Sequence, residues 1–109
     1  MINKIALGKF LKNAHKIIFY VKCDKCDFGN GPTDYIECTI TKLKDNKWDV
    51  THNDHLMNGS IVEITSSVAK FSEVVNMIIC NFKNNNTNIT KFFVDDKDVD
   101  PNIIIRMIM

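Results

Sequence analysis

Two pairs of metal-binding residue types stand at short spacings in this chain. Cys23 and Cys26 form a C-x2-C, and His52 and His55 form an H-x2-H. Zinc prefers four nitrogen or sulfur ligands in a tetrahedral arrangement, and a C-x2-C turn presents two thiolates to one ion. The full pattern, C-x2-C-x25-H-x2-H, therefore predicts a structural zinc site made by these four residues. Variants that use Cys38 or Asp54 as a ligand fall within the same hypothesis.

Simpler interpretations compete with this prediction. The H-x2-H spacing is tighter than the x3–5 of structural zinc sites, so the four residues are also explained as reduced thiols and solvated imidazoles. A redox role for the cysteine pair is disfavoured. A catalytic thiol gains reactivity at a helix N-terminus, whereas Gly29, Gly31 and Pro32 follow this pair. For Cys38 and Cys80 we expect packing in the core.

A run of lysines near the beginning of the sequence raises a second possibility. Residues 1–22 carry five lysines and no acidic residue. Such a segment can contact phosphates, and the candidate nucleic-acid contacts are Lys4, Lys9, Lys12, Lys16 and Lys25. The competing interpretation is a helix face that lysines solvate. Arg106 is the only arginine, which disfavours sequence-specific reading of DNA because guanine recognition favours arginine.

The elements that must position these residues follow from hydrophobic periodicity. Residues 2–14 predict a short amphipathic helix with Ile2, Ile5, Ala6 and Phe10 on its apolar face. The main helix is expected at about 67–83, with Ser66 and Ser67 as N-caps. Loops are expected at 24–33 and 52–59. Strands are expected at 17–22, 35–43, 48–51, 61–65, 89–94 and 102–108.

These elements predict one α+β domain spanning 1–109. Its largely antiparallel sheet of five to six strands is covered by the main helix, with the short N-terminal helix beside it. If strands 17–22, 35–43 and 48–51 form a meander, the cysteine and histidine pairs meet at one end of the sheet. The apolar last strand is either central or covered by a second copy, so a homodimer through an edge strand is one expectation.

Composition limits the function classes. The chain has 109 residues, 45% of them hydrophobic and 25% charged, with a net charge of +1. Near-neutral charge gives no global attraction to nucleic acid or membranes. No apolar run approaches the roughly 18 residues of a membrane-spanning helix. No secretory signal is evident, so we expect a cytoplasmic protein, in the producing or an infected cell.

No sequence signature of catalysis is present: the Walker A, G-x-G-x-x-G, G-x-S-x-G and H-E-x-x-H patterns are all missing. The favoured hypothesis is a small non-enzymatic binding or accessory protein, and the length and the Lys-, Ile- and Asn-rich composition fit an accessory or inhibitory protein of a phage or virus. It would dock onto another macromolecule, preferentially a protein, with or without structural zinc. The alternative is a zinc-supported nucleic-acid-binding protein. A small metal-dependent enzyme, with an open zinc position for water, is the third hypothesis.

Overall fold

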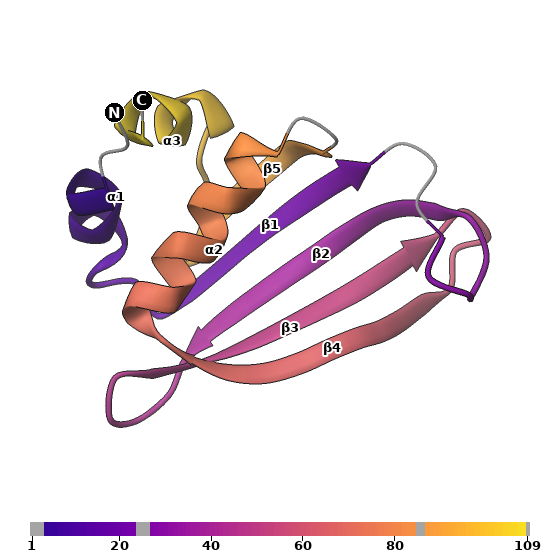
Figure 1. Cartoon of the computed structure of the whole chain (residues 1–109), viewed down its shortest axis with the longest axis horizontal. Coiled ribbons are helices and arrows are strands. Elements are labelled where there is room, and N and C mark those ends of the chain that lie inside the picture. The colour runs from indigo at the N-terminus through magenta and orange to yellow at the C-terminus, as the bar shows by residue number, and fades with distance from the viewer. Residues whose placement is uncertain (1–3, 24–26, 85–86, 109) are drawn as a thin grey trace.

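Six strands form one antiparallel sheet, and three helices lie against it (Figure 1). The structure is a computed structural model that describes residues 4–23, 27–84 and 87–108. The elements in chain order are α1 (Lys4–Leu11), β1 (Lys16–Cys23), β2 (Thr33–Lys42), β3 (Lys47–Leu56), β4 (Ile61–Lys70), α2 (Phe71–Lys83), β5 (Thr87–Val94), β6 (Lys97–Asp98) and α3 (Pro101–Ile108).

The sheet is a meander that is extended at its first strand. Its strand order is β4-β3-β2-β1-β5-β6. Strands β1 to β4 pair in succession, and α2 then carries the chain back so that β5 pairs with the free side of β1. The expected α+β fold with a largely antiparallel sheet is thereby confirmed.

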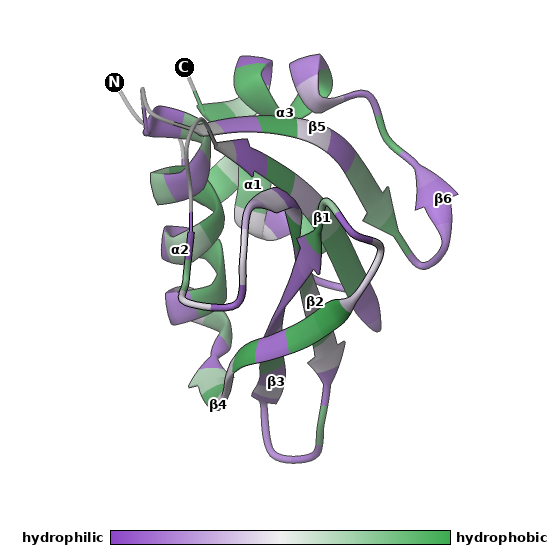
Figure 2. Ribbon diagram, turned by 90° about the vertical axis from the view of Figure 1, so that its right-hand side faces the viewer, coloured by the Kyte–Doolittle hydropathy of each residue, from purple (hydrophilic) through white to green (hydrophobic). Residues whose placement is uncertain are grey.

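Alternation along the strands decides which side chains are buried. On β1, Ile17, Phe19 and Val21 are buried, whereas Ile18 and Tyr20 are only partly covered. The buried set continues on β2 and β3 and packs with residues of all three helices, which therefore cover the same face: Leu7, Leu11, Cys38, Ile40, Trp48, Val50, Val74, Ile78, Phe92, Ile104 and Ile108. We call this the helix side of the sheet and the other the open face. Figure 2 shows that β6, at the far edge, is hydrophilic.

The main helix begins later in the chain than predicted. It starts at Phe71, while Ser66 and Ser67 lie within β4 and pair with Thr51 and Val50 of β3. The cause is the long β3, which continues to Leu56 and provides a template for a ten-residue β4. Sheet pairing therefore prevails over the capping tendency of the two serines.

The last expected strand is a helix. Pro101 stands at its first position, and the Asp100 carboxylate accepts a hydrogen bond of 2.9 Å from the backbone N–H of Asn102. This N-cap, with proline at the first helical position, favours a helix despite the β-branched residues that follow. Ile104 and Ile108 are buried in the core, so the segment offers no edge strand for the homodimer expected there.

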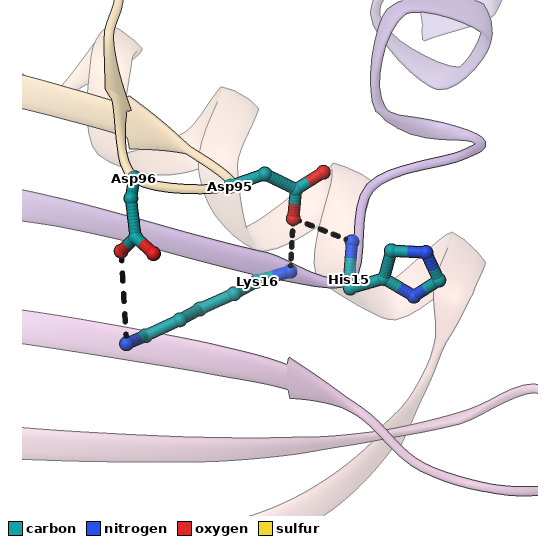
Figure 3. A network of polar contacts seen from close by, with 4 residues as sticks. All are labelled: His15, Lys16, Asp95 and Asp96. Atoms are coloured by element: carbon teal, nitrogen blue, oxygen red, sulfur yellow. Dashed lines mark hydrogen bonds and ion pairs between the residues drawn. The ribbon is translucent and has the colours of Figure 1, made fainter.

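The first helix turns a different face to the core than expected. Leu7 and Leu11 are fully buried, whereas Ile5 is 72% and Phe10 38% exposed. After the helix, the start of β1 is held by Asp95 (Figure 3): its carboxylate accepts hydrogen bonds from the backbone N–H groups of His15 and Lys16 at 2.8 and 2.9 Å.

Among the described residues, no helix is both long and apolar enough to cross a membrane.

Candidate functional site

The two histidines of the H-x2-H lie on opposite faces of the sheet. Residues 52–56 are the end of β3, not the loop predicted from sequence. His52 pairs with Cys38 on the helix side, and His55 pairs with Tyr35 on the open face. Since side chains alternate along a strand, the register separates the two imidazoles that the zinc hypothesis brought together.

On the open face, His55 is held by two contacts with β2. Its Nε2 lies 3.1 Å from Oε1 of Glu37, and its ring stacks on Tyr35 with 4.3 Å between centroids and an interplanar angle of 14°. Both members of the His55–Glu37 pair are mostly covered, with 18% and 23% of their side chains exposed. Burial, with smaller contributions from Tyr20, Glu37 and Asp34, raises the pKa of Tyr35. The phenol therefore stays protonated at neutral pH.

The stacked pair is part of a row of rings that crosses the open face. Tyr20 of β1 lies 4.8 Å from Tyr35, and Phe93 of β5 lies 5.7 Å from Tyr20, between ring centroids. We call Phe93, Tyr20, Tyr35 and His55 the aromatic row. It runs over four neighbouring strands, β5, β1, β2 and β3. All four side chains are partly exposed, so the row presents ring surface without being part of the core.

Charges of both signs surround the aromatic row. Lys22 lies 4.0 Å from Asp34, and Lys16 lies 3.9 Å from Asp96. The exposed Lys91 pairs in register with Tyr20. The face is therefore a ring-lined surface with balanced charge at its border, rather than a basic groove.

The helix side of β3 holds a buried carboxylate. Asp54 is fully buried, and neither of its carboxylate oxygens has a hydrogen-bond partner among the described residues. Thr33, buried at the same end of the sheet, likewise has an unpartnered hydroxyl. Burying a charged carboxylate without a partner is costly, so Asp54 is the described polar group on this side of the sheet that a cation or a hydrogen-bond donor would stabilise most.

Next to Asp54 along the same face stands His52. Its Nδ1 lies 3.0 Å from the Thr65 hydroxyl, which leaves Nε2 for another partner. Burial lowers the pKa of His52, so the ring is neutral at neutral pH, the form that binds metals. Cys38 opposite is fully buried, and burial, with a smaller contribution from Glu37, raises its pKa to about 12. That makes it a poor thiolate ligand.

The predicted sulfur ligands are not placed by the structure. Cys26 and the side chain of Cys23 lie outside the described residues, although the backbone of Cys23 ends β1 opposite Thr87. Within the part of the chain that is described, no group of three His, Cys, Asp or Glu side chains is arranged to hold a metal ion.

The candidate nucleic-acid contacts do not gather beside the rings. Lys4 and Lys9 are exposed on α1, which packs on the helix side, and Lys12 is exposed just after it. Lys16 is near the open face but is paired with Asp96, and Lys25 lies outside the described residues. Single-strand binders combine stacking rings with a positively charged groove. Lys4, Lys9 and Lys12 lie on a different surface from the rings, and the lysines that border the rings are accompanied by acidic residues.

A shallow groove between α1 and α2 is lined by Lys4, Ile5, Phe71 and Val75, among others. Its only titratable lining residue in the described chain is Lys4. The groove thus offers apolar contact and no acid–base pair.

Comparison with protein-family models, curated proteins and solved structures gives no match for this chain. No family relationship therefore enters the assignment of its function.

The aromatic row is not evident from the sequence because each ring stands in a different strand. A local signal exists: Tyr20 and Phe93 neighbour buried residues of their strands, and Tyr35 neighbours Ile36, which is partly buried against the core. Alternation sends the three rings to the opposite face. Their mutual proximity depends on the pairing of β5 with β1, which no local pattern reveals.

Proposed function

We propose that the protein is a binding module that docks another protein on the open face of its sheet, with the aromatic row as anchor. The observation that carries this proposal is the continuous row of partly exposed, mutually packed rings on a face that no described helix covers. Tyrosine and other aromatic residues are enriched at protein interfaces, where each ring buries a large area.

The geometry of the row favours binding in two ways. Contact with a neighbouring ring, stacked for Tyr35 and His55 and tilted for the other pairs, holds each ring in place before the partner binds. This lowers the entropy lost on association. The Lys22–Asp34 and His55–Glu37 pairs provide a polar border of both signs. Such a face fits a protein surface with an apolar or aromatic anchor between charges of both signs, and it fits a polyanion poorly.

Site-specific photocrosslinking in the producing cells tests the docking face. A benzophenone amino acid replaces Asn53, which neighbours Glu37 on the open face. The control position is the exposed Lys44 in the β2–β3 turn. We expect one discrete protein adduct from position 53 and none from position 44.

The double substitution Tyr20→Ser and Tyr35→Ser should abolish that adduct while circular dichroism shows an intact fold. Adducts that persist in the double variant, or that are the same from both positions, would contradict the proposal. Fluorescence anisotropy with labelled dT20 and U20 tests the alternative. Micromolar binding that weakens steeply with salt and with loss of the lysines would favour the zinc-supported nucleic-acid-binding protein instead.

A structural zinc ion at the helix-side end of β3 is a second proposal, favoured by the unpartnered carboxylate of Asp54. In this proposal Asp54 and His52 are two ligands, and the Thr65 hydroxyl orients the His52 ring. Cys23 and Cys26 supply the sulfur ligands, an assignment that comes from the sequence alone. His55, on the opposite face, has no part in it.

The substitution Asp54→Asn tests this site because its effect on stability should depend on zinc. Without metal, the amide replaces an unpartnered carboxyl of nearly the same size, so the free energy of unfolding should not decrease. With zinc, the variant should bind the ion at least about 100-fold more weakly and melt at a lower temperature than the parent.

His52→Asn should also lower zinc affinity, and His55→Asn serves as the matched control that keeps it. Elemental analysis of the purified chain and thermal melts with and without added Zn²⁺ provide the measurements. A zinc-free protein whose melting temperature Zn²⁺ does not change would exclude the site.

A further inference from the structure

The strand β4 leaves one long edge of the sheet unpaired. Figure 1 shows it as the outermost strand on its side, with no labelled element beyond it. It has ten residues, whereas the opposite edge, β6, has two. Ile61 and Val68 are 61% and 59% exposed on it. A long edge strand with exposed β-branched residues is a template for pairing with a further strand.

The charges of β4 are complementary to those of a second β4. The strand carries one acidic residue, Glu63, and one basic residue, Lys70, near its two ends. In the described part of the chain, neither side chain forms an ion pair. Since two copies that pair antiparallel bring opposite ends together, each Glu63 can meet the Lys70 of the other copy.

The register of this pairing follows from the bulge in β4. Pairing with β3 skips Ile64, because Thr65 stands opposite His52 and Glu63 opposite Asn53. If Ser67 faces Ser67 of the second copy, Ser66 faces Val68 and Thr65 faces Ala69. The extra residue at Ile64 then brings Glu63 opposite Lys70.

The same register keeps matching faces together, as a continuous sheet requires. Ser67 and Ala69 pair with the buried Val50 and Trp48, so they lie on the helix side. Ser66 and Val68 pair with Thr51 and Asp49 and lie on the open face. A strand centred on Ser67 pairs each residue with one from its own face, and the Glu63–Lys70 contact occurs twice, as in any two-fold interface.

We propose that the protein forms a two-fold homodimer by antiparallel pairing of β4 with β4 of a second copy, centred on Ser67 and closed by two Glu63–Lys70 pairs. The two sheets join into one, with one aromatic row in each half. The interface is separate from the aromatic row, so the dimer and the docking face stand or fall independently.

Sedimentation equilibrium of the full chain from 1 to 300 µM tests the dimer. We expect the mean mass to rise from one chain to two over this range. Glu63→Lys places like charges opposite each other twice, which should weaken the dimer by about tenfold or more. The exchange Glu63→Lys with Lys70→Glu restores both pairs and should recover the parental dissociation constant.

Asp98→Lys is the matched control, because it makes the same charge change on the opposite edge strand, and it should leave the dimer unchanged. Circular dichroism checks that each variant folds. A monomer at all concentrations overturns the proposal. So does a dimer that Glu63→Lys leaves intact, or one that the charge exchange fails to restore; the latter results point to another surface or another partner strand.

Discussion

At the scale of single residues, burial separates the two cysteines whose side chains are described. Cys38 is fully buried, and its pKa is raised to about 12, whereas Cys80 is exposed on α2, contrary to the core position expected for it. The reactive species is the thiolate, so we expect iodoacetamide at pH 8 to alkylate Cys80 in a Cys23→Ser, Cys26→Ser background. Alkylation of Cys38 should be slower by about a thousandfold or more, as measured by peptide mass spectrometry.

In concentrated urea the two thiols should react at similar rates, which provides the internal control. Equal rates in the folded protein would show that the β2 register, or the helix cover over it, is different from the one described.

The exposure of Cys80 has a simple geometric cause: it follows the buried Ile78 and Ile79 but points to the solvent side of α2.

The candidate site shows why residue spacing alone did not suffice. A zinc site made by Cys23, Cys26, His52 and His55 requires residues 52–59 to be a loop, in which both imidazoles can turn toward one ion. In a strand, residues three apart lie on opposite faces. His55 therefore lies beside the rings of the open face, and His52 lies beside Asp54 on the helix side. The sequence shows which residues have metal-binding side chains. It does not show on which face of the sheet each side chain lies, because that depends on whether 52–56 is strand or loop.

At the scale of elements, a tight turn connects β2 to β3. Asp45 and Asn46 are its central residues, with φ of 61° and 59°, and the Lys47 N–H donates a hydrogen bond of 3.3 Å to the Lys44 carbonyl. Positive φ at both positions is typical of a type I′ hairpin, in which glycine avoids the strain of a Cβ. Asn46→Gly should therefore stabilise the fold by about 0.5–1 kcal/mol, and Asn46→Val should destabilise it by about 1–2 kcal/mol.

Urea unfolding followed by circular dichroism measures both changes. Asn58→Gly, in the β3–β4 connection, is the contrasting substitution. Asn58 is not among the residues with positive φ, and its side-chain oxygen accepts a hydrogen bond from the Ser60 N–H, so glycine there should not stabilise the fold. If the valine variant is as stable as the parent, the turn does not have the left-handed geometry assigned to it.

The contact of Asp95 with the start of β1 should make stability depend on pH (Figure 3). Hydrogen bonds from the backbone N–H groups of His15 and Lys16 hold the pKa of Asp95 below its ordinary value of 3.8. A carboxyl whose pKa is lower in the folded state adds stability above its unfolded pKa, and this stability is lost as the pH falls through the folded value.

We therefore expect Asp95→Asn to lower the melting temperature at pH 6 and to have a progressively smaller effect as the pH falls below 3.8. Asparagine keeps a carbonyl acceptor and tolerates the positive φ of 49° at this position, so the substitution isolates the charge. The neighbouring Asp96→Asn, whose carboxylate is 83% exposed in its contact with Lys16, is the control. Equal pH profiles for parent and Asp95→Asn would contradict the assignment.

Periodicity predicted most of the elements because their patterns are local. The alternation of Ile36, Cys38 and Ile40 and the helical spacing of Val75, Ile78 and Phe82 both correspond to real elements. The errors lie where tertiary pairing overrides local tendency, as in the serines drawn into β4. At the start of α3, Asp100 followed by Pro101 is an N-cap pattern that favours a helix. The β-branched run Ile103–Ile105 favours a strand instead, and the prediction of a strand there is wrong.

At the scale of the whole molecule, the protein divides into a covered side and two exposed surfaces. The helices bury one face of the sheet, the aromatic row occupies the other, and β4 leaves an edge free. In a β4-mediated dimer, two rows would lie on one continuous face. A partner with two binding segments would then bind more tightly than either contact allows, since the second contact forms at a high effective concentration.

Hydrogen exchange of the backbone amides reports on this division. The free energy of local unfolding is greatest for core strands and least at the edges of a structure. The amides of β1, which lies between β2 and β5, should therefore be protected from exchange at every protein concentration. In β4, half of the amides face away from β3. They should exchange rapidly at 1 µM and become protected at 300 µM, as second copies pair with them. Lys97 and Asp98 of β6 should exchange rapidly at both concentrations because that edge gains no partner. Protection that rises in β6 instead of β4 would move the interface to the other edge, and protection that changes in neither would leave the sheet without an edge-to-edge contact.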